Sequence, residues 1–143
     1  MPPRTRQPCA AHAQRLAKAQ RLAEVHLVDR YDRAQLTALD RVDQLDRAAT
    51  PLVVPFHTSR VYRTEPTSRP RRATIAGPEF RVTRDTVLTL LNLGLIYCAD
   101  VVRIDAGPDR DRPDEQRSAY LLTATRHGRD VLDIARRIRR LPR

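Results

Sequence analysis

The chain has 143 residues, of which 41% are hydrophobic and only 4% aromatic, and its formal net charge is +10. A chain of this length fits one domain, which buries roughly 70% of the surface that the unfolded chain exposes, so we expect one aliphatic core over residues 1–143. No stretch reaches the roughly 18 apolar residues that cross a bilayer, and no apolar leader is found, which predicts a cytoplasmic protein without a membrane partner. The positive charge favours DNA or RNA as partner.

Motifs for catalysis and metal binding are missing from the sequence. Cys9 and Cys98 lie far apart, and the four histidines fall in separate segments, without the spacing of a zinc site. The four glycines are scattered, so there is no glycine-rich phosphate loop, and there is no Gly-x-Ser-x-Gly turn. We therefore expect a protein that is not an enzyme and that needs no cofactor.

Hydrophobic periodicity predicts an α+β fold that is mainly α. Apolar residues recur at steps of three and four over residues 8–31, which predicts a long amphipathic N-terminal helix. A second helix is predicted over 38–48, with Thr37 as its N-cap. Residues 50–79 contain five prolines and predict an extended or loop segment with one or two short strands.

The second half of the chain begins with another capped helix. Thr83 is a suitable N-cap for a helix over 83–93. Strands are then predicted from Ile96 to Ile104 and from Ser118 to Leu122, and the polar link between them predicts a β-hairpin over 96–122 with a long tip. Thr123 is expected to cap a last, long helix over 124–140, which carries apolar residues on one face and arginines mostly on the others.

This half of the chain resembles a known family. The run Thr86-Val87-x-x-Leu90-x-x-x-Gly94-Leu95-Ile96 resembles the end of the recognition helix of MarR-type winged-helix regulators. The run Asp114-Glu115-Gln116-Arg117-Ser118-Ala119-Tyr120-Leu121-Leu122-Thr123, followed by Gly128 and Leu132, resembles their wing and the start of their closing helix. The resemblance covers about residues 81–132.

The resemblance implies a winged-helix domain in which 83–93 is the recognition helix and 96–122 is the wing. It also implies a homodimer that forms through the long N-terminal and C-terminal helices. One element departs from the family pattern, because the helix that precedes the recognition helix falls in 60–80, where the prolines exclude a regular helix. We expect a loop there.

Candidate DNA contacts lie on the predicted recognition helix and in the proline-rich segment. On the helix, Arg84, Asp85 and Thr89 can face the major groove, while Arg81 and Thr83 lie at its phosphate-facing start. Arginines of the proline-rich segment and of the base of the wing are expected to hold phosphates. They are Arg60, Arg63, Arg69, Arg71, Arg72 and Arg117.

Two features leave other interpretations open. Leu88 and Leu91 make the helix over 83–93 apolar nearly all round, and the wing tip over 107–116 is net acidic. The leading hypothesis is a winged-helix regulator of transcription that binds double-stranded DNA. The alternative is a winged-helix module that binds another protein and has no DNA binding of its own. RNA binding is a third possibility, against which the low aromatic content counts.

Overall fold

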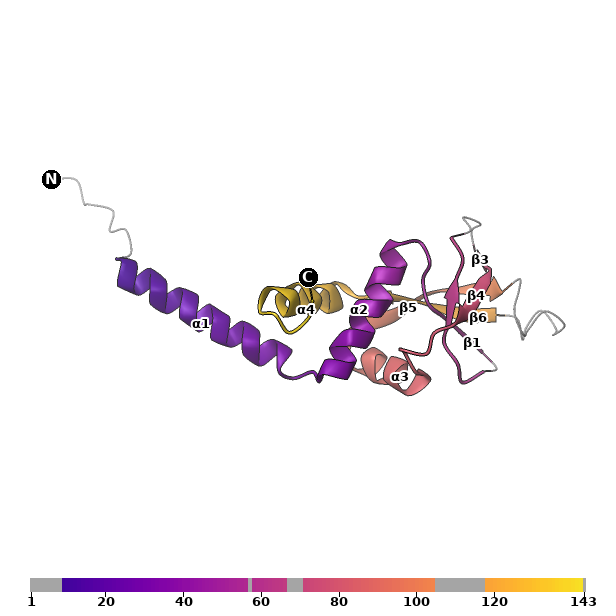
Figure 1. Cartoon of the computed structure of the whole chain (residues 1–143), viewed down its shortest axis with the longest axis horizontal. Coiled ribbons are helices and arrows are strands. Elements are labelled where there is room, and N and C mark those ends of the chain that lie inside the picture. The colour runs from indigo at the N-terminus through magenta and orange to yellow at the C-terminus, as the bar shows by residue number, and fades with distance from the viewer. Residues whose placement is uncertain (1–8, 57, 67–70, 105–117, 143) are drawn as a thin grey trace. The chain divides into compact units, whose positions relative to one another are not determined.

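The computed structural model describes residues 9–56, 58–66, 71–104 and 118–142. The chain divides into two compact units, Met1–Tyr31 and Asp32–Arg143. In the described residues, the first unit contains one helix, and the second contains three helices and one six-stranded sheet (Figure 1). None of the described helices is long and apolar enough to span a bilayer.

The first unit consists of α1 (Ala10–Val28), which confirms the predicted N-terminal helix with slightly shorter bounds. Six of its 19 residues are alanine, the residue with the highest helix propensity, and most of the others are straight-chain residues that also favour helix. Its two large apolar side chains near the middle are exposed, Leu16 to 57% and Leu22 to 53%.

The second unit combines the remaining elements in one sheet and three helices. In chain order these are α2 (Arg33–Arg47), β1 (Val53–Pro55), β2 (Tyr62–Thr64), β3 (Arg72–Ala73), β4 (Ile75–Pro78), α3 (Arg84–Asn92), β5 (Ile96–Ile104), β6 (Ser118–Ala124) and α4 (Arg126–Arg137). The strand order is β3-β5-β6-β1-β2-β4, with β3 and β5 parallel and every other pair antiparallel. Only Thr74 separates the two edge strands β3 and β4, so the sheet is nearly closed.

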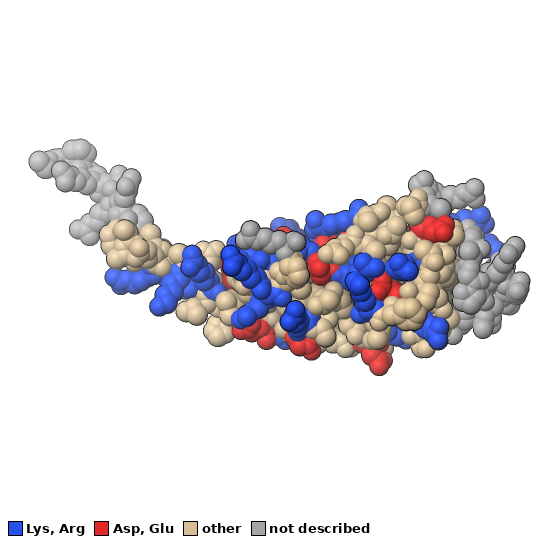
Figure 2. Space-filling model, in the orientation of Figure 1, with Lys and Arg blue, Asp and Glu red and all other residues tan. Residues whose placement is uncertain are grey.

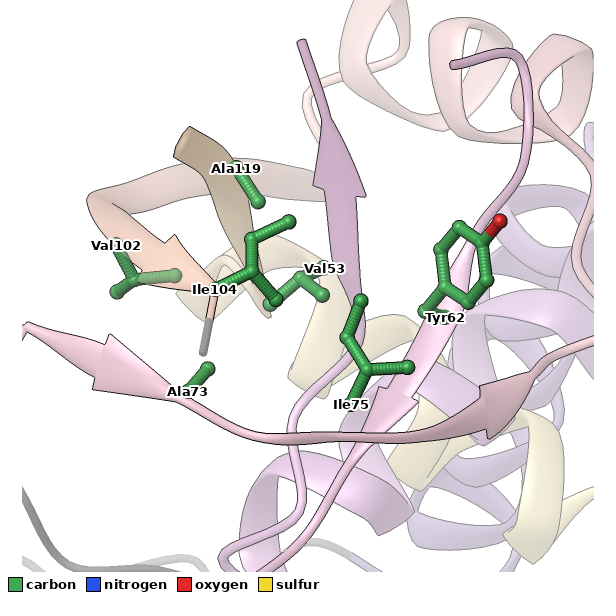
Figure 3. Packing of buried hydrophobic residues seen from close by; sticks show 7 residues of the cluster. All are labelled: Val53, Tyr62, Ala73, Ile75, Val102, Ile104 and Ala119. Carbon is green, nitrogen blue, oxygen red and sulfur yellow. The ribbon is translucent and has the colours of Figure 1, made fainter. Parts of the chain in front are cut away.

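One apolar cluster fills the inside of this curved sheet, and every strand contributes to it (Figure 3). Its members are Val53, Tyr62, Ala73, Ile75, Val102, Ile104 and Ala119. Figure 3 shows Ala73 and Ile75 on one continuous stretch of chain that passes across the other strands. Because β3 and β4 are very short, this shared burial stabilises them more than their few ladder hydrogen bonds do.

The helices form a second layer in which α2 packs against α3, α4 and β6. A reciprocal capping box starts α2, since Gln35 N–H donates to Asp32 Oδ1 at 2.7 Å and Asp32 N–H donates to Gln35 Oε1 at 3.1 Å. Ion pairing of Asp40 with Arg136 joins α2 to α4. The fully buried leucines are Leu39, Leu52, Leu90, Leu95, Leu122 and Leu132.

The predicted winged helix is wrong, because the described residues form four helices and a nearly closed mixed sheet of six strands. The described part of 50–79 contains no helix, as predicted, but it supplies four strands, β1 to β4, rather than one or two, and they join the hairpin β5–β6 in one sheet. The last helix also differs from the prediction, because α4 ends at Arg137 and buries its apolar face within its own unit. The expected wing tip over 107–116 lies outside the described residues.

Two of the three predicted N-caps are wrong. Asp32 caps α2, whereas Thr37 lies inside that helix. Thr125 caps α4, whereas Thr123 belongs to β6. Thr83 is confirmed as the N-cap of α3. In both wrong cases a better-placed side chain accepts the hydrogen bond from the first turn of the helix. For α4 this side chain, Thr125, lies two residues after the predicted cap.

Gly128 allows the start of α4 to lie against the residues between α3 and β5. A Cβ atom there would lie 2.1 Å from the carbonyl oxygen of Leu95, which accepts a hydrogen bond from the Thr125 N–H at 2.9 Å. Helix propensity alone predicts that Gly128→Ala stabilises the protein by up to about 1 kcal/mol. We expect the opposite, a loss of about 2 kcal/mol in the free energy of unfolding, because backbone must move to admit the methyl group.

Thermal unfolding followed by circular dichroism measures this difference. Gly77→Ala is the matched control, since its Cβ would meet only the end of the Arg63 side chain, at 3.4 Å. A Tm for Gly128→Ala equal to or above that of the parent protein would contradict the close approach.

Candidate nucleic-acid interface

Between β4 and α3 the chain presents Phe80, whose side chain is 82% exposed, more than any other large hydrophobic side chain of the described residues. Phe80 lines two shallow pockets, which also share Pro78 and Glu79. One has a volume of about 360 Å³ and the other of about 260 Å³. We call the charged residues of both pockets, with Pro78 and Phe80, the Phe80 surface. It consists of Arg41, Arg60, Arg63, Pro78, Glu79, Phe80, Arg81 and Arg84.

The Phe80 surface is strongly basic. It contains five arginines and one glutamate, so its net charge is +4. Figure 2 shows that basic side chains on the drawn face of the protein are numerous and that acidic side chains lie between them. The Phe80 surface thus combines five guanidinium groups with one exposed aromatic ring.

Strand pairing and the α2 helix bring the residues of the first pocket together. Arg63 on β2 lies opposite Gly77 on β4, and the ladder continues one residue further, since the Glu79 N–H donates to the Val61 carbonyl at 2.8 Å. Gly77 leaves room for the Arg63 side chain, whose Nη2 would lie 3.4 Å from a Cβ at that position. Arg41 reaches the same place from α2.

The Glu79 carboxylate organises this pocket. Its side chain is only 4% exposed, and Oε2 accepts hydrogen bonds from Arg41 Nε at 3.1 Å and Arg41 Nη2 at 3.0 Å. Oε1 accepts from the Arg81 backbone N–H at 3.1 Å. Arg63 Nε lies 3.9 Å from Oε2, so this second arginine is held less closely. The carboxylate thus fixes Arg41 and the backbone beside Phe80.

The start of α3 lines the second pocket. Arg84 Nη1 donates to the backbone carbonyl of Thr58, which ties the helix to the segment before β2. Among the residues that the structure describes, the guanidinium groups of Arg60 and Arg81 have no hydrogen-bonding or ionic partner. These two groups are therefore available to an anion.

Four of the arginines expected to contact DNA, Arg60, Arg63, Arg81 and Arg84, come together on the Phe80 surface. Two other expected residues serve α3 itself. The Thr83 hydroxyl accepts from the Thr86 N–H at 3.2 Å, and the Thr89 hydroxyl donates to the Asp85 carbonyl at 3.0 Å. Asp85 is exposed in the first turn of α3 and lines neither pocket.

The remaining expected residues lie elsewhere. Arg71 and Arg72 line a different pocket of about 160 Å³ together with two carboxylates, Glu65 and Asp100, so that site has no net charge. Arg69 and Arg117 lie outside the described residues.

Sequence analysis missed Arg41, Glu79 and Phe80. Phe80 had a local signal, since it is one of only two phenylalanines and stands between a glutamate and an arginine in a polar turn. Arg41 and Glu79 had none, because a pairing across 38 residues depends on how α2 packs on the sheet.

Other reactive groups lie outside the Phe80 surface. Within the described ranges, no three His, Cys, Asp or Glu residues are grouped as metal ligands would be. Burial raises the pKa of the Cys98 thiol above its ordinary value. A hydrogen bond with the Asp100 backbone opposes this increase, whereas the negative charge of the Asp100 carboxylate adds to it. This environment disfavours the reactive thiolate at neutral pH.

Comparison with family models of proteins, with curated proteins and with solved structures found no match. The resemblance to MarR-type regulators therefore stays a prediction, and the argument for function depends on the geometry of the Phe80 surface.

Substitution of Glu79 tests its organising role. Glu79→Gln keeps the shape of the side chain but removes the charge that faces Arg41. We expect the free energy of unfolding to fall by about 2 kcal/mol, because a buried charge pair loses one partner while Arg41 remains partly buried. Urea unfolding at neutral pH measures this change in the free energy of unfolding.

The control is Glu65→Gln, which removes the same charge from an exposed position and is expected to change stability by less than about 0.5 kcal/mol. Equal stabilities of the two variants would show that Glu79 does not hold the pocket.

Proposed function

We propose that this protein binds nucleic acid, without catalysing a reaction, and that the Phe80 surface contacts the phosphate backbone. The observation that carries the proposal is the gathering of five arginines and one buried glutamate around a single exposed ring. Guanidinium groups bind phosphate oxygens through paired, charge-assisted hydrogen bonds. DNA and RNA present the same phosphates, so the proposal covers both.

The arginines have different roles in this proposal. Arg60 and Arg81, whose guanidinium groups have no partner among the described residues, make the principal phosphate contacts. Arg63 contributes from the edge of its pocket, since its distance of 3.9 Å from Glu79 Oε2 leaves it weakly held. Arg41 and Arg84 position the surface, through Glu79 and the Thr58 carbonyl respectively.

The proposal predicts binding that depends on salt. With about three phosphate contacts, the affinity for a labelled oligonucleotide should fall roughly 20- to 40-fold between about 50 and 200 mM monovalent salt, because each contact releases counterions from the nucleic acid. Fluorescence anisotropy measures the dissociation constant at each salt concentration.

Two variants localise the contacts in the same titration. Arg60→Ala and Arg81→Ala should each weaken binding several-fold and make the salt dependence less steep by about one phosphate contact. Arg129→Ala is the matched control, because Arg129 is exposed on α4, lines neither pocket and carries the same charge. Equal losses in all three variants would mean that net charge alone drives binding, and no binding at 50 mM salt would reject the proposal.

We also propose that α1 mediates self-association. Leu16 and Leu22 are more than half exposed on this helix, and the intervening alanines would let a second helix approach closely. The C-terminal helix is not part of this proposal, since the apolar side chains of α4 are buried within their own unit. Leu88, 48% exposed on α3, offers the alternative surface for a protein partner.

Sedimentation velocity tests self-association over a range of protein concentrations. The double variant Leu16→Glu/Leu22→Glu should remain monomeric at concentrations where the parent protein forms dimers, because charges replace the exposed apolar side chains. Leu88→Glu should leave the dimer intact. If Leu88→Glu dissociates it and the double variant does not, the interface lies on α3.

A further inference from the structure

We infer that the Phe80 surface binds a single-stranded segment of nucleic acid, with one base stacked on the Phe80 ring and phosphates held by the flanking arginines. This inference rests on the proposed function and adds to it the form of nucleic acid that the surface accepts.

The backbone on both sides holds Phe80 in place. Glu79 before it is buried, with its N–H donating to Val61 and its carboxylate accepting from the Arg81 N–H. Val82 after it is 1% exposed. The ring is thus presented outward from a short turn whose backbone is anchored on both sides, so stacking of a base has to order only the side-chain torsions of Phe80.

Cationic groups lie in both pockets that the ring lines. One pocket contains Arg63 and Arg81, and the other contains Arg60 and Arg84. In a single strand, bases and phosphates alternate along one chain and both are accessible. One base can therefore cover the ring while neighbouring phosphates reach the arginines of the two pockets. Aromatic side chains within basic grooves bind single strands in this way.

A duplex suits this surface less well. Its bases are stacked on each other, so their faces are not available to Phe80 without unstacking. A duplex-reading helix also needs free polar groups, but the hydroxyls of Thr83 and Thr89 are used within α3. Leu88 on the same helix is exposed. These contacts favour a single strand over the major groove.

Anisotropy with oligonucleotides of about 12 nucleotides tests the preference. The probes are single-stranded thymidine DNA, single-stranded uridine RNA and a mixed-sequence DNA duplex, at about 50 mM salt. The full-length protein should bind at least one single strand more tightly than the duplex. Phe80→Leu should weaken that binding about 10-fold and leave duplex binding unchanged. Tyr97→Leu, an aromatic substitution at an exposed position of β5 outside both pockets, should change neither.

A direct readout of stacking is also available, because the chain contains no tryptophan. Phe80→Trp places a single indole at the site, and a stacked base should quench its fluorescence in step with binding. The same variant should bind the single strand at least as tightly as the parent protein, which separates loss of the ring in Phe80→Leu from a structural defect.

The outcomes separate this inference from the proposed function. If single strand and duplex bind equally, if Phe80→Leu has no effect, or if binding leaves the indole fluorescence unchanged, nucleic-acid binding stands and base stacking is rejected. If no probe binds, the proposed function fails and the inference fails with it.

Discussion

The buried Glu79 carboxylate is the interaction on which the Phe80 surface depends. A charge with 4% exposure is costly unless donors surround it, and here Arg41 and the Arg81 N–H supply three hydrogen bonds. These bonds join α2 to the turn between β4 and α3. The same turn presents Phe80, so one carboxylate fixes both the Arg41 guanidinium and the backbone that carries the ring. Removing the charge would loosen the pocket and the turn together.

The nearly closed sheet explains why these residues meet at all. β2 and β4 are neighbours in the sheet, which places Arg63 beside Gly77 and leaves the residues that follow β4 next to those that precede β2. The two pockets are therefore built from segments that the sheet aligns, and α2 and α3 close them. Because the strands are short, the apolar cluster inside the sheet, rather than long ladders, maintains this alignment.

The sequence allowed the local elements to be predicted, but not how they pair. Apolar periodicity predicted α1, Thr83 predicted the start of α3, and two strand-like segments joined by a polar link predicted the hairpin β5–β6, because each signal lies close together in the sequence. The winged helix was wrong because the strands of 50–79 pair with distant partners, and such pairing depends on register and packing. Four arginines of the site were found by their charge, whereas the Arg41–Glu79 pair required the tertiary structure.

In the proposed function, Glu79 also decides how the surface would hold and release an anion. Three guanidinium groups in one pocket repel each other, and the carboxylate offsets this while holding Arg41 at 3.0 Å and Arg63 only at 3.9 Å. An incoming phosphate could bind the Arg63 guanidinium without breaking the hydrogen bonds between Arg41 and Glu79. Salt screens the attraction between arginine and phosphate, but it does not weaken contact with the Phe80 ring. In the proposed binding mode, a basic surface with one exposed aromatic side chain would therefore keep part of its affinity where charge alone would lose it.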